Sequence, residues 1–511
     1  MCGFFASNYQ FNDVALLKKK LDFNLSFRGP DFQSEVVEYK GWYLYHSRLS
    51  IIGISPNFNQ PYCGDKGVLV YNGEILNYKQ LGLKYFYKEY LSDTEFLYDY
   101  LNYHSPDLNQ IDGFFSFVFI DNNGILKIAA RDKFGVKPLF TTRKGSSISY
   151  SSEPNILVDL FNLTLNDNAL LEYKFFRYPL TMTYYNNLYE IPPGSTNKST
   201  YFSARNYLLK SKPISFVEAS NGIKKSLQNS IKSRLISDVP VGLLFSGGID
   251  SNLISALCGD NSIKKFTIGT QDDFDTKWAQ KTTDATVIEY SREAFLDRLD
   301  QMVRLRREPL SVPNEVTLSL VADCWQNSGG KVLLSGEGAD EFFGGYDRIF
   351  QHFHMCGNKF NVTDFLSFYL YASPEQLPTY LFEYISDYFA DLSDYTNFNK
   401  LRIFFIEHHL PVLFRRLDFS LMFSGIEGRE PFCSLDVFNA SIDINPSDVF
   451  SSFGRGKMHL RYIAEKLFGK EFAYSKKVGF PIDFKKILTG INSLDNIESY
   501  TYWHDYNMRL L

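Results

Sequence analysis

The chain has 511 residues and a formal net charge of −5, with 44% hydrophobic and 17% aromatic residues. This length exceeds what one hydrophobic core usually supports, so we expect two domains. Acidic and basic residues are mixed along the chain without a basic stripe, which argues against a nucleic-acid-binding protein.

The cysteines and the apolar runs exclude further classes of protein. The six cysteines are dispersed without a CxxC pair, and the eight histidines show no metal-ligand spacing. This favours reduced thiols over a disulfide framework or a zinc site. The longest apolar runs, such as residues 113–120, fall short of a ~20-residue membrane span, and no signal-peptide pattern opens the chain. We expect a cytoplasmic protein with no membrane or nucleic-acid partner.

Cysteine occupies position 2, directly after Met1. Removal of Met1 would place a thiol and a free α-amine on the same residue. An α-amine has a pKa of roughly 7.7–8.0, so near neutral pH it can take the proton of the thiol and activate it. Cys2 is therefore a candidate nucleophile. Taken alone, it could equally be an incidental N-terminal residue.

Short apolar runs separated by turns fill residues 2–194 and predict strands, as in an all-β or layered α/β domain. Clear examples are residues 42–45, 67–71, 115–120, 126–129 and 148–150.

Polar residues stand in the turns between these runs. Arg48 ends one run, Asn72-Gly73 precedes Glu74, and Asp93 lies in a short acidic segment. A site that hydrolyses glutamine needs an arginine for the α-carboxylate, an acid for the α-ammonium and donors for the oxyanion. Each segment also has a structural explanation, since Asn-Gly favours a hairpin and Asp93 can cap a helix.

The second half opens with a helical period. Ile223, Leu227, Ile231 and Leu235 recur every four residues and predict an amphipathic helix. Residues 239–245 then predict a buried parallel strand that runs into an SGGIDS loop at residues 246–251 and a further helix. Backbone N–H groups at such a junction bind phosphate oxygens. The loop lacks the Gly-Lys-Ser/Thr of a Walker A motif, and Asp250 needs a cation such as Mg²⁺ to approach phosphate.

A second strand is predicted at residues 331–334, before the sequence SGEGADEFFGGY of residues 335–346. Three carboxylates and four glycines within these twelve residues argue against a core segment. A solvated acidic turn is the remaining structural explanation.

Together with Cys2, the motifs of the first half resemble the glutaminase domain of the class II, N-terminal-nucleophile glutamine amidotransferases. The resemblance extends over residues 27–31, 112–117, 131–139 and 152–153. It implies an αββα sandwich over residues 1–205. It also implies a nucleophile, Cys2; two residues for the glutamine α-groups, Arg48 and Asp93; an oxyanion hole, Asn72 and Gly73; and a further glutamine-site residue, Glu74.

The second half resembles the synthetase domain of glutamine-hydrolysing asparagine synthetases, and its SGGIDS loop is similar to the PP-loop of ATP pyrophosphatases. Residues 246–251, 335–346, 425–432, 456–461 and 476–480 carry the resemblance. It implies an α/β domain with a parallel sheet over residues 215–511. The implied ATP-binding residues are Leu244, Ser246, Gly247, Gly248, Asp250, Ser251, Ile268, Ser335 and Gly336.

The same resemblance implies the roles of the charged residues. Asp250 and Asp340 would hold Mg²⁺ and pyrophosphate, Glu337 would be the base when ammonia attacks, and Lys457 would stabilise the activated acyl intermediate. The chain departs from the family pattern at Asn252, at residues 433–436, and at residues 285–290, which lack a histidine pair. The last ~25 residues match no motif. Together these departures bear on the identity of the acceptor more than on the ATP chemistry.

These motifs predict that ammonia released from glutamine reacts with an acyl-adenylate made from ATP, which turns aspartate into asparagine. Two alternatives stay open. The same machinery could amidate another carboxylate, such as a sugar acid in surface-polysaccharide assembly. The chain could also be an inactive regulator that binds nucleotide or glutamine. The family resemblance further implies a homodimer.

Overall fold

The computed structural model describes residues 2–103, 106–259, 263–269, 284–357, 359–451, 454–475 and 482–511.

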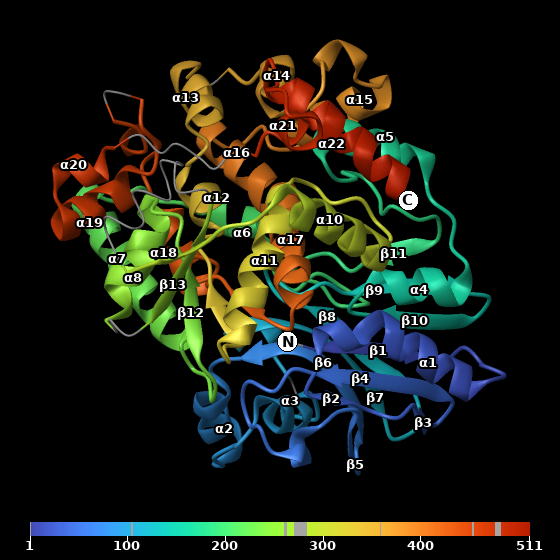
Figure 1. The fold of residues 1–511 in the computed structure, drawn as a ribbon. Coiled ribbons are helices and arrows are strands. Elements are labelled where there is room, and N and C mark those ends of the chain that lie inside the picture. Colours follow the sequence, from blue (N-terminus) through green and yellow to red (C-terminus); the bar gives the residue numbers. More distant parts are fainter. Residues whose placement is uncertain are drawn as a thin grey trace.

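The first half of the chain forms two antiparallel sheets that pack face to face (Figure 1). One has the strand order β11-β9-β10-β1-β4-β2, with β3 beside β4: Leu188–Glu190, Phe140–Lys144, Ser147–Ser151, Gly3–Ser7, Trp42–Arg48, Phe32–Gln33 and Val37–Tyr39. The other has the order β5-β6-β7-β8: Tyr62–Gly64, Gly67–Ile75, Gly113–Asp121 and Leu126–Arg131.

Both faces of the central strands β1, β4 and β6 are buried, because helices cover the outer side of each sheet. In β6, Val68 and Val70 pack between the sheets, whereas Leu69 and Tyr71 pack with the outer helices. The helices of the second sheet are α2 (Tyr78–Phe86) and α3 (Asp93–Leu101). Those of the first sheet are α1 (Val14–Leu25), α4 (Pro154–Phe161) and α5 (Asp167–Phe176). The predicted αββα sandwich is confirmed.

The second half is built on one parallel sheet with the strand order β14-β13-β12-β15-β16. These strands are Thr286–Ile288, Lys264–Ile268, Val241–Leu244, Val332–Leu334 and Glu427–Arg429. Leu243 and Leu334 face one helical layer, and Leu333 faces the other. The predicted parallel sheet is thus confirmed, with β12 shorter than the apolar run that predicted it.

Helices cover both faces of this sheet. On one side lie α7 (Phe216–Arg234), α8 (Ile249–Cys258), α18 (Leu435–Ile442) and α19 (Met458–Phe468), and on the other α11 (Asn314–Asn327) and α17 (Leu410–Met422). The predicted periodic positions Ile223, Leu227 and Ile231 are the buried stripe of α7. The described residues also form α6 (Ala204–Leu208), α10 (Arg292–Arg306), α12 (Ala339–Phe343), α13 (Asp347–Met355), α14 (Val362–Tyr369), α15 (Thr379–Ala390), α16 (Asn397–Phe404), α20 (Lys470–Ala473), α21 (Phe484–Thr489) and α22 (Asn496–Leu510).

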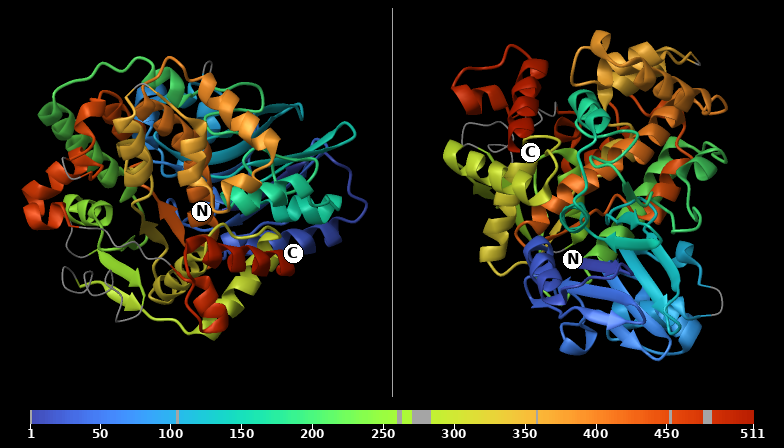
Figure 2. Two further views of the ribbon diagram at one scale, coloured as in Figure 1. Left: turned by 90° about the horizontal axis from the view of Figure 1, so that it is seen from above. Right: turned by 90° about the vertical axis from the view of Figure 1, so that its right-hand side faces the viewer.

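The two halves share a broad apolar junction, along which the first half (blue to teal) lies against the second (Figure 2). Four phenylalanine rings mark it. Phe134 lies 5.4 Å from Phe342, and Phe202 lies 6.1 Å from Phe438, measured between ring centroids. All four side chains are buried. Among the described residues, no helix combines the length and the apolarity that crossing a membrane requires.

Candidate functional site

Cys2 lies at the start of β1, where this strand pairs with the end of β4 through Gly3 and Ser47. The close pairing requires glycine at position 3, because a Cβ there would lie 2.5 Å from the Ser47 hydroxyl. The Cys2 backbone N–H donates to Asn72 Oδ1 at 2.9 Å, and Arg28 Nε donates to the Cys2 carbonyl at 3.0 Å. Burial raises the pKa of the Cys2 thiol. The thiol therefore needs a base to become a nucleophile.

The predicted oxyanion residues lie beside Cys2 in β6. Gly73 has φ of +141°, and a Cβ there would lie 2.0 Å from the Phe114 carbonyl, so the position requires glycine. Within the described part of the chain, Asn72 Nδ2 and Glu74 Oε2 are buried atoms without a hydrogen-bond partner. Since buried polar groups are normally paired, these atoms are available to a polar ligand.

Two predicted glutamine-site carboxylates lie in this region. Asp93 Oδ2 accepts hydrogen bonds from the Tyr71 hydroxyl at 2.8 Å and from the Ile75 N–H at 3.0 Å. Burial, followed by the nearby Asp93 carboxylate, raises the pKa of Glu74. The cap of α3 is Ser92, whose side chain accepts from the Thr94 N–H, so Asp93 does not serve as the cap.

Arg48 lies at the end of β4, and its guanidinium binds the loop that follows. Its nitrogens donate to the Ser55 carbonyl at 3.0 Å, to Asn59 Oδ1 at 2.8 Å and to the Gly53 carbonyl at 2.5 Å. Arg48 thus fixes this loop to the end of β4. Its binding of the glutamine α-carboxylate stays a prediction.

A second site lies at the carboxyl ends of β12, β13 and β15, where a cavity of about 330 Å³ opens. Of the predicted residues, its lining includes Leu244, Ser246, Asp250, Ser251, Ile268, Ser335, Gly336, Glu337 and Asp340. Ligands of open parallel sheets bind at this edge because the loops that follow the strands converge there. Gly247 and Gly248 belong to the same loop but are not among the described lining residues. Asn252 Nδ2 donates to both of their carbonyls at 2.9 Å, so the departure from the family pattern at this position fixes the loop.

Lys457 stands between two carboxylates at the edge of this cavity. Its Nζ lies 2.8 Å from Asp250 Oδ2 and 2.6 Å from Asp340 Oδ1. Burial favours the neutral amine, but the two carboxylates outweigh it and raise the pKa of Lys457. In the described residues no group of three or more His, Cys, Asp or Glu side chains could hold a metal ion.

The donor set nonetheless fits Mg²⁺. Mg²⁺ is usually bound by one or two carboxylates together with substrate phosphates. Asp250 and Asp340 supply two carboxylates that converge on one point, which the positively charged Lys457 ammonium group occupies. The residues 476–480 that contribute to the family resemblance lie outside the described residues.

Arg416 of α17 also lines the cavity, where its Nη2 donates to Glu337 Oε1 at 3.0 Å. The sequence did not predict that Arg416 lines this cavity, nor that Asn314 and Thr317 at the start of α11 do so. A signal for Arg416 existed, because two adjacent arginines, Arg415 and Arg416, interrupt a largely apolar helix.

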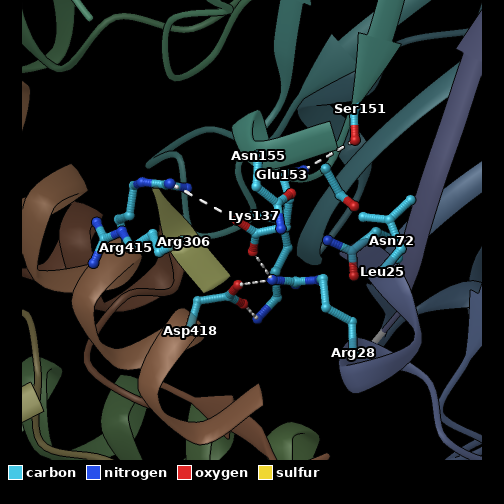
Figure 3. A network of polar contacts seen from close by, with 12 residues as sticks. Leu25, Arg28, Asn72, Lys137, Ser151, Glu153, Asn155, Arg306, Arg415 and Asp418 are labelled. Atoms are coloured by element: carbon cyan, nitrogen blue, oxygen red, sulfur yellow. Dashed lines mark hydrogen bonds and ion pairs between the residues drawn. The ribbon is translucent and has the colours of Figure 1, made fainter. Parts of the chain in front are cut away.

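Buried charges connect the two sites across the junction (Figure 3). Arg28, which holds the Cys2 carbonyl, pairs with Glu153 and, at 2.7 Å, with Asp418 of α17. Lys137 Nζ lies 3.4 Å from the other oxygen of Asp418. Arg415, next to Arg416, lies 3.7 Å from Glu153. One helix, α17, therefore lines the cavity and also pairs with Arg28, the residue that holds the Cys2 carbonyl.

Comparisons with known proteins cover the whole chain. The family model described as "Asparagine synthase" matches residues 222–497, and the one described as "Glutamine amidotransferase domain" matches residues 1–208. The chain is 27% identical to "Asparagine synthetase [glutamine-hydrolyzing] 1" of Bacillus subtilis, over 100% of this chain and 93% of that protein. It is 29% identical to "Asparagine synthetase [glutamine-hydrolyzing] 2" of Oryza sativa, over 70% of this chain and 61% of the rice protein. A solved structure titled "Structure of the allosteric regulatory enzyme of purine biosynthesis" is 15% identical, covers 60% of this chain and 78% of that chain, and has a TM-score of 0.28, too low to carry an argument.

Proposed function

Because the chain belongs to the asparagine synthase family, we propose that it is a glutamine-dependent amide ligase that makes asparagine from aspartate and ATP. We assign glutamine hydrolysis to residues 1–205 and amide synthesis to residues 215–511. The observation that carries the proposal is the gathering of Asp250, Glu337, Asp340 and Arg416 around one cavity, in the same chain as the buried Cys2.

Glutamine hydrolysis would begin at Cys2 after removal of Met1. The α-amine takes the thiol proton, and Sγ attacks the side-chain carbonyl of glutamine to form a tetrahedral oxyanion. Asn72 Nδ2 and the Gly73 N–H stabilise this oxyanion, which is supported by the absence of another partner for Asn72 Nδ2 in the described residues. The amide nitrogen takes a proton and leaves as ammonia. Water then cleaves the glutamyl thioester and restores the thiol.

In the second site, a carboxylate oxygen of the acceptor would attack the α-phosphorus of ATP and expel pyrophosphate. Mg²⁺, held by Asp250 and Asp340, would offset the negative charge of the phosphates. The N–H groups of the SGGIDS loop, which Asn252 fixes, would bind phosphate oxygens. Lys457 lies beside both aspartates and would stabilise charge on the activated acyl group.

Ammonia would then attack the acyl-adenylate, which releases AMP. Attack leaves a positive charge on nitrogen, so a base must remove a proton as the amide forms. We assign this role to Glu337, which lines the cavity and is oriented by Arg416 at 3.0 Å.

The test measures pyrophosphate release with Mg-ATP and glutamine, in the presence and absence of aspartate. We expect release that depends on aspartate, with asparagine formed in equal amount. Cys2→Ala should lose glutamine-dependent synthesis but keep ammonia-dependent synthesis, whereas Asp250→Asn should lose both. Glutaminase activity without aspartate-dependent pyrophosphate would refute aspartate as the acceptor, and glutamine hydrolysis by Cys2→Ala would refute the nucleophile.

A further inference from the structure

Helix α22 belongs to the C-terminal segment that matched no motif, yet it packs where the two halves meet, beside α5 and α10 (Figure 1). We propose that α22 is a positioning element, which holds the loop between α10 and α11 (residues 307–313) and thereby couples glutamine hydrolysis at Cys2 to nucleotide binding. This inference rests on the proposed function. It assigns a role to residues that contact neither substrate.

Helix α22 binds the backbone of the α10–α11 loop through two side chains that are fully buried. Trp503 Nε1 donates to the Leu310 carbonyl at 3.0 Å and to the Ser311 carbonyl at 3.2 Å. The Leu310 N–H donates to Asn507 Oδ1 at 2.9 Å. Trp503 and Asn507 are both 0% exposed, so water cannot replace these hydrogen bonds when they break.

The first half of the chain also binds this loop. The Tyr173 hydroxyl of α5 donates to the Leu310 carbonyl at 2.7 Å, and the Tyr185 hydroxyl donates to the Arg307 carbonyl. A carbonyl oxygen has two lone pairs. The Leu310 oxygen therefore accepts one hydrogen bond from the first half and one from α22, and the loop cannot shift without losing one of them.

From this loop, one set of contacts leads to the glutaminase site. Glu308 Oε2 accepts from Arg415 at 2.7 Å. Arg415 in turn lies 3.7 Å from Glu153, which pairs with Arg28. Arg28 holds the carbonyl of Cys2 at 3.0 Å. The position of the loop thus bears on the residue that carries the nucleophile.

A second set of contacts leads from the loop to the nucleotide cavity. Glu315 accepts hydrogen bonds from the backbone N–H groups of Ser311 and Val312, and so fixes the loop to the first turn of α11. Asn314 and Thr317 of that same helix end line the cavity. Contacts of side chains therefore link the α10–α11 loop to both sites, and α22 supplies three of the hydrogen bonds that anchor it.

The test uses the full chain and two single substitutions, each of which removes a hydrogen-bond donor to the Leu310 carbonyl. Trp503→Phe removes the donor of α22 but keeps a ring against Phe484, which packs 4.9 Å from the indole. Tyr173→Phe removes the donor of the first half. Thr501→Ala is the matched control, because Thr501 is exposed on the same helix. Melting temperatures verify that each variant folds.

The readout is the rate of glutamine hydrolysis with and without ATP, which needs no acceptor. We expect ATP to change this rate in the wild type and in Thr501→Ala. In Trp503→Phe and in Tyr173→Phe we expect the ATP response to fall by about threefold, as suits the loss of one buried hydrogen bond. Both variants should keep ammonia-dependent pyrophosphate release within about twofold.

An unchanged ATP response in both variants overturns the inference, and so does a wild type whose glutamine hydrolysis ignores ATP. An equal loss of ammonia-dependent synthesis also overturns it, because α22 would then merely support the synthetase fold. A wild type that responds to ATP but releases no pyrophosphate with aspartate contradicts the proposed acceptor instead. In that case, loss of the ATP response in Trp503→Phe still supports the role of α22.

Discussion

Asp418→Asn tests the buried charges between the two sites most directly. The carboxylate pairs with Arg28 at 2.7 Å and with Lys137 at 3.4 Å, and the exposures of the three side chains are 3%, 0% and 1%. Asparagine has almost the same shape but no charge. The substitution therefore removes one of the two carboxylates paired with Arg28, which keeps Glu153 and the Cys2 carbonyl. It also removes the carboxylate paired with Lys137, while the packing around α17 is kept.

The expected cost follows from this burial. Removing one partner of a buried ion pair costs about 3–5 kcal/mol when the remaining charge is left without compensation. Arg28 keeps Glu153 whereas Lys137 loses its paired carboxylate, so we expect a cost near the lower end of this range. Each kcal/mol of lost stability lowers the melting temperature of a domain of about 150–250 residues by about 2–4 °C. We therefore expect Asp418→Asn to lower the melting temperature by at least about 6 °C. Glutamine hydrolysis should also fall, because Arg28 holds the Cys2 carbonyl.

The pH dependence gives a second readout. Burial alone would raise the pKa of Asp418, but Arg28 and Lys137 outweigh burial and hold this pKa below its ordinary value. The unfolded chain then binds the proton more readily, so the contribution of Asp418 to stability is complete above its unfolded pKa of about 3.9 and is lost as the pH falls through the lower folded value. The difference in stability between wild type and variant should shrink in acid.

The assay compares thermal unfolding of the wild type, Asp418→Asn and the control Asp391→Asn across pH. Asp391 is exposed at the end of α15, and its substitution should change the melting temperature by less than about 1 °C. If Asp418→Asn melts within that margin at neutral pH, these ion pairs do not stabilise the junction and the reasoning is refuted.

Four further substitutions test the two sites. Gly73→Ala would place a methyl group 2.0 Å from the Phe114 carbonyl oxygen. Glutamine hydrolysis should therefore fall by about 10²-fold or more while ammonia-dependent synthesis persists, and an equal loss of both activities would count against a local effect. Lys457→Met should abolish pyrophosphate release with either nitrogen source, and release within about tenfold of wild type would contradict its role. Glu337→Gln should slow amide formation by about 10²–10⁴-fold while ATP–pyrophosphate exchange continues, and loss of exchange as well would assign Glu337 to the first step instead. Asn252→Ala removes two hydrogen bonds to the loop and should raise the KM for ATP by about tenfold without changing the melting temperature by more than a few degrees; an unchanged KM would show that the loop needs no such support.

The layers of the fold were predictable because they follow from local patterns. The continuous apolar run at the start of β6 predicts a strand, and the four-residue period of α7 identifies its buried face, in both cases without knowledge of the partner. The residues of the cavity were predicted from the family resemblance, and the sheet explains why they lie together. Leu244, Ile268 and Ser335 end or follow neighbouring parallel strands, so any correct sheet order brings them to one edge.

The contacts between the halves could not be read in this way. The Tyr173 hydroxyl meets the Leu310 carbonyl across 137 residues of chain, and Asp418 meets Lys137 across 281. Within the second half, the Trp503 indole meets the same carbonyl across 193 residues. Neither partner is marked by a local period, because each position is decided by how two separate units dock. Trp503 and Asn507 did offer a faint signal, since they lie one turn apart on the buried side of an otherwise polar helix.

The phenylalanine rings at the junction limit how this molecule can move during a catalytic cycle. Separating the halves as rigid bodies would expose Phe134, Phe202, Phe342 and Phe438 to water, at about 1.5–3 kcal/mol for each ring. Such an opening would therefore be too rare to occur in every turnover. Whatever passes between the two sites must therefore cross a junction that stays closed.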